Sequence, residues 1–257
     1  MAASQPEMES TVKRKLRKEF DRFLLRRLPA FNASKSAFYV QFRPDFDVDY
    51  GRFEPAQALR EAWTREMERN NWGDLGRLYF LFLNVQRLRE NNVEGDFAEV
   101  GVFKGNSAKV LHLLAPERRL WLFDTFAGFA DDDAQRERSA VKRRDFGNTS
   151  LDRVRSFLGH SPRLEFVPGK FPETAARVPE KARFALVHLD CDLHAPTLAG
   201  LEFFYPRLSR AGLLVVHDYA SGHWPGVAQA VDEFLADKPE KPVLIPDKSG
   251  SAALVKV

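Results

Sequence analysis

The second half of the chain alternates short apolar runs with amphipathic stretches, and this alternation restricts the fold more than any other feature of the sequence. Five of the runs have the length of a strand and consist largely of Val, Leu, Phe and Ala. They are residues 97–100, 120–123, 164–168, 184–190 and 213–217. Strands that are apolar on both faces are typical of a parallel sheet covered on each side.

Helical patterns separate these runs, at residues 107–114, 150–158, 197–208 and 227–235. Repeated strand–helix units with right-handed crossovers predict an α/β fold with a doubly wound, mostly parallel sheet. Two further runs, 242–246 and 252–257, flank a turn-forming Asp-Lys-Ser-Gly and predict an antiparallel hairpin that closes the sheet at seven strands.

The first part of the chain has a different character. Residues 11–28 predict a basic amphipathic helix, residues 29–55 are aromatic and irregular, and residues 54–90 predict two helices broken at Asn70–Gly73. We interpret residues 1–92 as an N-terminal helical extension that acts as a lid, and residues 93–257 as the catalytic domain. We interpret the basic helix as docking on its own domain or on a second subunit, which suggests a homo-oligomer, and an anionic membrane surface is the alternative partner.

Composition excludes several classes of protein. The net charge is +3, but residues 1–30 hold eight Lys or Arg against four Asp or Glu, so the remainder is close to neutral and a nucleic-acid partner is not expected. The single cysteine excludes an internal disulfide and a cysteine-based zinc site. Neither a membrane helix nor a signal peptide is evident, so we expect no integral membrane contact and a cytoplasmic location.

Two of the expected strands end in residues that suit a nucleoside. Glu99 leads into a turn with Gly101 and Gly105 and then a helix, where glycines and free N–H groups let a ligand approach the backbone. Asp124 ends the next strand, where a carboxylate can accept both ribose hydroxyls. Because the phosphate-binding glycine patterns are absent, S-adenosylmethionine is favoured over a dinucleotide. Packing glycines and a solvated aspartate are the structural alternatives.

Acidic residues and a histidine follow the last two parallel strands. Asp190 and Asp192 end one strand, and His217 and Asp218 end the next. Carboxylates gathered at one sheet edge cost free energy unless a cation or a proton neutralises them. Oxygen-rich ligation favours Mg²⁺ or Mn²⁺. Solvated carboxylates, one of them capping a helix, are the alternative.

Four segments resemble the macrocin/mycinamicin-type sugar O-methyltransferases (TylF/MycF-like), a family of class I methyltransferases with a Rossmann-like fold. They read FAEVGVFKGNSAKVL, LWLFDTFAGF, VHLDCDLHAPTLAGLEFFYPRLSRAGLLVVHDY and PGVAQAVDEF, and they span residues 95–234. The resemblance implies an S-adenosylmethionine-dependent, magnesium-assisted O-methyltransferase that acts on a sugar hydroxyl in natural product biosynthesis.

The resemblance also implies roles for individual residues. Asp190, His217 and Asp218 fall where the family binds its metal, and Asp192 matches the general base. The positions that correspond to the cofactor site are Glu99, Gly101, Gly105, Ser107, Asp124, Thr125, Phe126, Gly169 and Lys170.

His217 stands where the family usually has an aspartate. Magnesium rarely accepts an imidazole, so His217 weakens the site, shifts it toward manganese or another divalent ion, or turns away from it. Alternatively His217 is the base of a metal-independent O-methyltransferase. A catechol acceptor, a nicotinamide-dependent oxidoreductase and a non-enzymatic scaffold are further alternatives.

Overall fold

The computed structural model describes residues 74–130, 132–133 and 146–257. It also describes Leu16, Glu19, Phe20 and Phe23 as helical, and the two-residue strands β1 (Phe31–Asn32) and β2 (Ala37–Phe38), which pair antiparallel. The first of the two helices expected in residues 54–90, the break at 70–73 and most of the expected lid lie outside the described residues, whereas the second helix is present as α5 (Leu75–Glu90). The chain divides into two compact units, residues 1–75 and residues 76–257.

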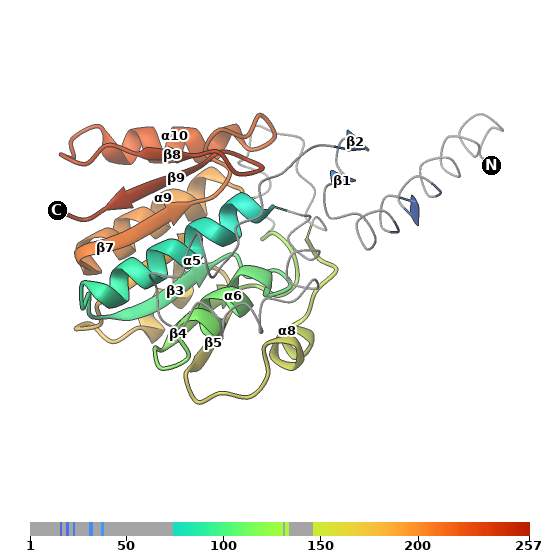
Figure 1. The fold of residues 1–257 in the computed structure, drawn as a ribbon, viewed down its shortest axis with the longest axis horizontal. Coiled ribbons are helices and arrows are strands. Elements are labelled where there is room, and N and C mark those ends of the chain that lie inside the picture. The colour runs from blue at the N-terminus through green and yellow to red at the C-terminus, as the bar shows by residue number, and fades with distance from the viewer. Residues whose placement is uncertain are drawn as a thin grey trace, which may run out of the picture. The chain divides into compact units, whose positions relative to one another are not determined.

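The second unit contains the predicted sheet, and its class and topology are confirmed. Seven strands are ordered β5-β4-β3-β6-β7-β9-β8, and only the pairs β7–β9 and β8–β9 are antiparallel (Figure 1). The strands are β3 (Asp96–Val100), β4 (Leu120–Asp124), β5 (Leu164–Pro168), β6 (Phe184–Leu189), β7 (Leu208–Val216), β8 (Val243–Ile245) and β9 (Ser251–Val255). The order reverses between β3 and β6, so this pair forms the topological switch point of the sheet.

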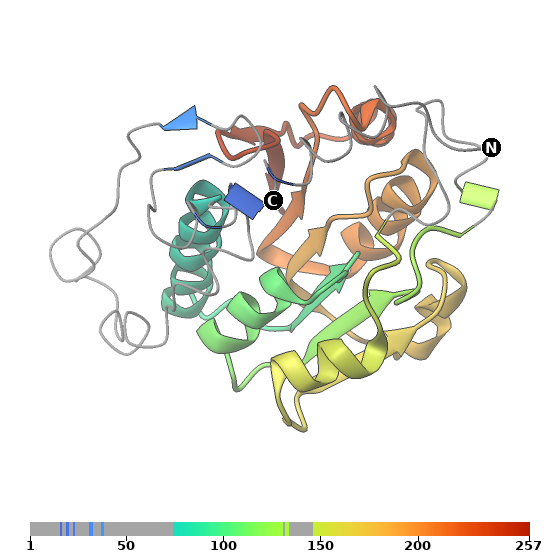
Figure 2. The same cartoon turned by 90° about the vertical axis from the view of Figure 1, so that its right-hand side faces the viewer.

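Helices lie on both sides of the sheet, as the doubly wound topology requires. Figure 2 shows α5 and α6 on one side and α9 and α10 on the other. The helices are α5 (Leu75–Glu90), α6 (Asn106–Leu114), α8 (Leu151–Leu158), α9 (His194–Phe204) and α10 (Pro225–Leu235), with 3₁₀ turns η1 (Glu173–Arg177) and η2 (Tyr205–Arg207). In the described residues no helix is long and apolar enough to cross a membrane.

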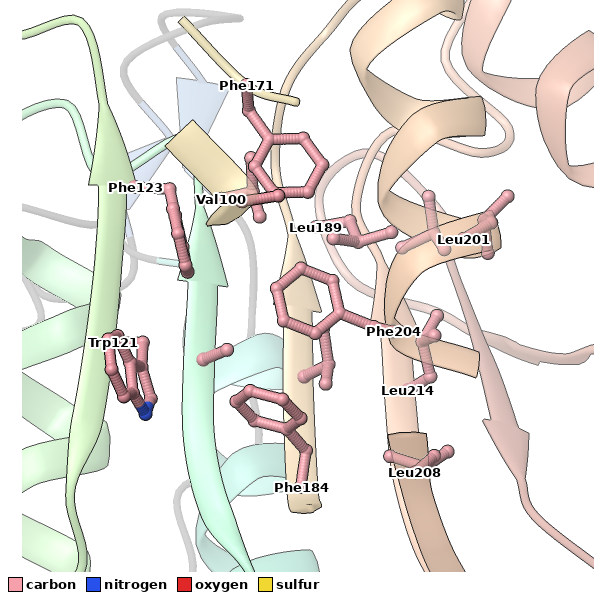
Figure 3. Close-up of a cluster of buried hydrophobic side chains, with 14 of the residues drawn as sticks. Val100, Trp121, Phe123, Phe171, Phe184, Leu189, Leu201, Phe204, Leu208 and Leu214 are labelled. Carbon is pink, nitrogen blue, oxygen red and sulfur yellow. The ribbon is translucent and has the colours of Figure 1, made fainter. Parts of the chain in front are cut away.

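Aromatic rings fill the core between the sheet and α9. Phe204 on α9 is completely buried, and its ring stacks on Phe171 at 5.7 Å and meets Phe184 edge-to-face at 5.0 Å (Figure 3). Phe123 of β4 adds a third contact with Phe204 at 5.9 Å. Large side chains packed this closely dominate the burial of apolar surface in a domain of this size.

The two largest differences between the structure and the predicted element boundaries are at the start of β7 and the end of α9. Strand β7 begins at Leu208 instead of residue 213, because a register shift against β6 places Ala211 at φ 60° and lets the strand continue beyond the irregularity. Helix α9 ends at Phe204 instead of residue 208, because Pro206 imposes a 3₁₀ turn there.

Helix α5 belongs to the unit that contains the sheet. That unit begins at Gly76, earlier than the expected boundary between residues 92 and 93. The side chains of Leu78, Leu81, Phe82 and Val85 on α5 are completely buried. The helix is therefore a layer of the domain, and it brings its own side chains close to the sheet.

Candidate active site

Strained backbone gathers where the parallel strands end. Phe103, Phe126, Asp192 and Asp218 follow β3, β4, β6 and β7, and each has a φ between 49° and 63°. A side chain at such a φ costs about 1–3 kcal/mol and persists only where the surrounding structure enforces it. We call these strand ends, together with the turns that follow them, the carboxyl edge. In sheets of this topology ligands bind at this edge, beside the switch point.

Gly101 allows the turn after β3 to cross β6. Its φ is 89°, and a Cβ atom at this position would lie 1.9 Å from the carbonyl oxygen of Asp190. The amide of Asp190 donates to the carbonyl of Val100 at 2.8 Å, so the two backbones are in direct contact. Gly101 thus has a packing role, whether or not it also touches a cofactor. Gly105, at φ 81°, precedes the first turn of α6.

Glu99 is sealed inside the protein. Its side chain is 0% exposed, and Oε1 accepts hydrogen bonds from Ser107 Oγ at 2.5 Å and from Nδ1 of His188 at 2.7 Å. Oε2 is buried without a hydrogen-bond partner among the described residues. The carboxylate therefore ties β3 to β6 and α6, and its second oxygen is an unsatisfied buried acceptor. The sequence identified Glu99 and Ser107 but not their partner His188, which reads as an ordinary strand residue.

Asp124 organises the turn that the sequence analysis assigned to the cofactor. Its Oδ2 accepts from the amides of Val102 and Phe103, both at 2.7 Å, and its Oδ1 accepts from the amide of Phe126 at 2.6 Å. A carboxylate has about four acceptor sites, so three backbone bonds leave capacity for one more donor. The contacts fix the turns after β3 and β4 relative to each other.

The remaining predicted cofactor residues lie at the ends of β4 and β5. The Thr125 hydroxyl donates to the Gly128 carbonyl at 2.5 Å and shapes the turn that contains Phe126. Gly169, at φ 130°, donates its amide to the carbonyl of Asp124 at 2.9 Å. Lys170 forms ion pairs with Asp132, with Asp133 at 3.1 Å and with Glu173 at 3.7 Å. The structure thus brings these residues to one edge, with Lys170 already engaged by carboxylates.

The polar residues after β6 and β7 form one group with Arg77 of α5, in which Asp218 is buried and the others are half-buried. We call it the Asp190 cluster: Asp190, Asp192, His217, Asp218 and Arg77. His217 Nδ1 lies 2.9 Å from Oδ1 of Asp190 and 2.8 Å from Oδ2 of Asp218. Arg77 on α5 donates to Oδ2 of Asp190 at 3.1 Å. The sequence predicted the acids and the histidine, whereas Arg77 was missed because it lies more than a hundred residues away.

Opposite charges offset the repulsion between the carboxylates of the Asp190 cluster. Burial acts to raise the pKa of Asp190, but His217 and Arg77 outweigh it and hold that pKa well below its usual range. Burial acts to lower the pKa of His217, but Asp190 and Asp218 raise it to about 10. Burial, together with Asp190 and Asp218, raises the pKa of Asp192 well above its usual value. The carboxylates are therefore neutralised by a guanidinium, an imidazolium and a retained proton.

Asp190, His217 and Asp218 form one potential metal site, with ligand atoms all within 4.8 Å of one another. The donor set does not suit magnesium. A nitrogen within hydrogen-bond distance of two carboxylates directs its hydrogen toward them and offers no lone pair between them. Arg77 occupies the second oxygen of Asp190. Magnesium prefers oxygen ligands in octahedral geometry, and a fixed guanidinium beside the ligand opposes a divalent cation.

Four aromatic rings also gather at the carboxyl edge, a group that the sequence analysis missed. Phe146 packs edge-to-face on Phe103 at 5.1 Å and on Phe129 at 5.3 Å, and Trp224 lies 5.9 Å from Phe129. These residues come from the turns after β3, β4 and β7 and from the segment before α8, so the sequence shows them only as isolated aromatics.

Comparisons with known proteins identify the family of the chain. A family model described as Macrocin-O-methyltransferase (TylF) matches residues 73–250, which include every strand of the seven-stranded sheet except β9. A tetracenomycin-sugar 4'-O-methyltransferase from Streptomyces olivaceus is 31% identical over 160 residues, 57% of this chain and 61% of that protein. Demethyldecarbamoylnovobiocin O-methyltransferase from Streptomyces niveus is 27% identical over 201 residues, 69% of this chain and 76% of that protein.

Solved structures share the fold. The O-methyltransferase NovP has a TM-score of 0.62 at 24% identity, over 71% of this chain and 80% of that chain. CalS11, a calicheamicin methyltransferase, has a TM-score of 0.62 at 22% identity, over 99% of this chain and 94% of that chain. The family match covers more than half of the sequence and all of the carboxyl edge. The chain therefore belongs to the macrocin O-methyltransferase family.

Proposed function

We propose that the protein is an S-adenosylmethionine-dependent O-methyltransferase that acts on a sugar hydroxyl of a glycosylated natural product. The observation that carries this proposal is the convergence at one edge of the Gly101–Gly105 turn, Asp124 and the Asp190 cluster, on both sides of the switch point. The relative from Streptomyces olivaceus, whose name specifies a rhamnosyl-tetracenomycin, supports the acceptor class. The aromatic rings at the carboxyl edge would suit an apolar aglycone.

In this mechanism residues at the ends of β3 and β4 would hold the cofactor. Two carboxylate acceptors could bind its amino and ribose groups. One is Oε2 of Glu99, which is buried, and the other is the remaining acceptor site of Asp124, which is half-buried. The cofactor supplies an electrophilic methyl group beside the acceptor oxygen. Because methyl transfer is an in-line displacement, the main task of the protein is to hold the acceptor oxygen about 3 Å from that methyl group.

His217 is the group best placed to take the proton from the acceptor hydroxyl. Its Nδ1 is held by Asp190 and Asp218, and its Nε2 is buried with no hydrogen-bond partner among the described residues. A carboxylate-oriented imidazole with one free nitrogen is the arrangement of a general base, and the carboxylates stabilise the imidazolium that forms. Asp192 is the second candidate, although it already shares a hydrogen bond with Asp218.

A bound sulfonium affects this base directly. His217 has a pKa of about 10 in the protein alone, so its Nε2 is protonated at neutral pH. The positive sulfonium of a bound cofactor would act to lower the pKa of His217. Magnesium assistance, which the resemblance implies, is not part of this mechanism because the donor set does not suit the ion. The homo-oligomer and the cytoplasmic location stay predictions.

Calorimetry with S-adenosylhomocysteine and with NAD tests the cofactor class. We expect S-adenosylhomocysteine to bind and NAD not to bind; the reverse result would support the oxidoreductase alternative and contradict the proposal. A positive result should then be followed by methyl transfer from labelled S-adenosylmethionine to sugar hydroxyls and to a catechol. Transfer to the catechol alone would change the acceptor class.

Two variants identify the proton acceptor. His217→Gln should lower kcat by about 10²–10⁴-fold, the usual contribution of a general base, and should leave S-adenosylhomocysteine binding intact. Asp192→Asn should cause the smaller loss. The opposite ranking would assign the proton transfer to Asp192, as the family resemblance implies.

A further inference from the structure

Arg77 places a permanent positive charge inside the Asp190 cluster. Its guanidinium donates to Oδ2 of Asp190 at 3.1 Å, and the two side chains are 13% and 21% exposed. An arginine side chain stays protonated throughout the pH range in which proteins fold. Deprotonation therefore cannot remove this charge to allow a metal to bind. The charge is removed from the cluster only if the Arg77 side chain moves away.

His217 occupies the space between the other two carboxylates. Nδ1 lies within 2.9 Å of Asp190 and 2.8 Å of Asp218, so its hydrogen points into the triangle in which a cation would have to bind. Ionised carboxylates only accept hydrogen bonds, which requires Nδ1 to be the donor. A divalent ion at this point would meet an N–H group where it needs a lone pair.

We propose that Arg77 and His217 replace the divalent metal in this chain, so that the methyl transfer proceeds without one. The inference rests on the proposed function, and it concerns how the acidic residues are held. Arg77 is a positioning residue in this arrangement: it fixes Asp190, and Asp190 fixes the ring of His217. The two cationic side chains keep three carboxyl groups together without an added ion.

The absence of a metal has a consequence for the acceptor. A metal that activates a sugar must chelate two neighbouring oxygens, whereas an imidazole nitrogen interacts with a single hydroxyl. We therefore expect the protein to methylate acceptors in which the hydroxyl next to the reacting one is absent or blocked. Matched acceptors that differ only in a deoxy position would show comparable kcat values.

Manganese binding provides a direct test that does not depend on activity. Electron paramagnetic resonance of Mn²⁺ titrated into the unaltered protein should show no stoichiometric bound ion, and dialysis against EDTA should leave transfer unchanged. Stoichiometric Mn²⁺ binding that Mg²⁺ displaces, or activity that EDTA abolishes and Mg²⁺ restores, would overturn the inference.

Converting the site gives the complementary result. His217→Asp removes the N–H group and supplies an oxygen ligand, so Mn²⁺ affinity should rise roughly 10- to 100-fold. Combining it with Arg77→Gln should raise the affinity further. Arg89→Gln is the matched control on the same helix, because Arg89 pairs with Glu117 outside the cluster and its removal should not alter metal binding. If neither cluster variant binds Mn²⁺ better than the control, Arg77 and His217 do not exclude the metal.

These outcomes separate the inference from the proposed function. Failure to bind S-adenosylhomocysteine contradicts the function, while the Mn²⁺ titration still decides whether the cluster takes a metal. If His217→Asp does not fold, as circular dichroism would show, the titration of the unaltered protein decides alone.

Discussion

The carboxyl edge and the aromatic core are held together by different kinds of interaction. Around Phe204 the core consists of packed aromatic and aliphatic side chains, and its ring meets those of Phe123, Phe171, Phe184 and Phe203 at 4.9–5.9 Å. A few residues further along the same strands, the backbone takes positive φ values and the buried groups are charged. The core contributes burial of apolar surface, whereas the edge depends on hydrogen bonds, ion pairs and the absence of a side chain at Gly101.

This contrast shows that the carboxyl edge is less favourable for stability than the core, because its residues are held in positions that suit a ligand. Strained φ values and buried carboxylates each oppose folding, and both gather at the edge where a ligand would bind. The core can supply the stability that offsets them because its side chains only pack against one another and do not bind a ligand. The predictions below test this division, in order of the size of the expected effect.

Gly101→Ala should have the largest effect. The new Cβ atom would meet the Asp190 carbonyl at 1.9 Å, a backbone contact that no rotamer change relieves, and φ 89° is unfavourable for alanine. We expect loss of soluble folded protein or a destabilisation above about 4 kcal/mol, measured by chemical denaturation. Gly159→Ala is the control, because Gly159 has a similar φ of 86° with nothing within 4 Å. It should cost about 1–3 kcal/mol, because φ 86° with ψ 177° is a conformation that glycine favours; equal costs would mean that the backbone conformation and not the contact explains Gly101.

Phe204→Ala should weaken the core without altering the edge. The side chain is completely buried among aromatic neighbours, so its removal leaves a cavity and should lower the free energy of unfolding by about 3–5 kcal/mol. Affinity for S-adenosylhomocysteine, measured by calorimetry below the unfolding temperature, should stay the same. A loss of affinity comparable to the loss of stability would show that core and edge are not separable.

His217 makes the stability of the edge depend on pH. Its pKa rises from 6.5 in the unfolded chain to about 10 in the protein, so its contribution is fully present below pH 6.5 and is lost as the pH rises through 10. The free energy of unfolding should therefore fall between pH 7 and 10. His217→Gln should flatten this decline in urea titrations. An equally steep decline in the variant would assign it to other groups.

Ala211→Gly should have the smallest effect, and it should be stabilising. Ala211 has a φ of 60° in the irregularity at the start of β7, away from the carboxyl edge, and glycine takes this conformation without steric cost. We expect a gain of about 0.5–1 kcal/mol in thermal or chemical denaturation, with unchanged cofactor affinity. A destabilisation would show that the alanine methyl group contributes packing that outweighs the strain.

Much of the fold could be predicted because its signals are local. The apolar runs from Phe97, Leu120, Leu164 and Phe184 appear as strands at nearly the expected boundaries, and the hairpin after residue 242 closes the sheet. The start of β7 was not predictable in the same way. Its irregularity depends on the partner strand β6, and pairing across the sheet does not show in the residues of one strand.

The sequence by itself determined the alternation of elements, the acidic and glycine residues at the strand ends, and the family to which they belong. Only the tertiary structure decided what those residues contact. Gly101 has no room for a side chain because the backbone of Asp190 lies against it, and Asp124 accepts hydrogen bonds from backbone amides. Arg77 reaches Asp190 from a helix more than a hundred residues earlier in the chain. The physical reason is the separation along the chain over which each kind of interaction acts. Periodicity and turn preference act between neighbours along the chain, whereas a close approach or an ion pair depends on where the folded backbone places distant residues.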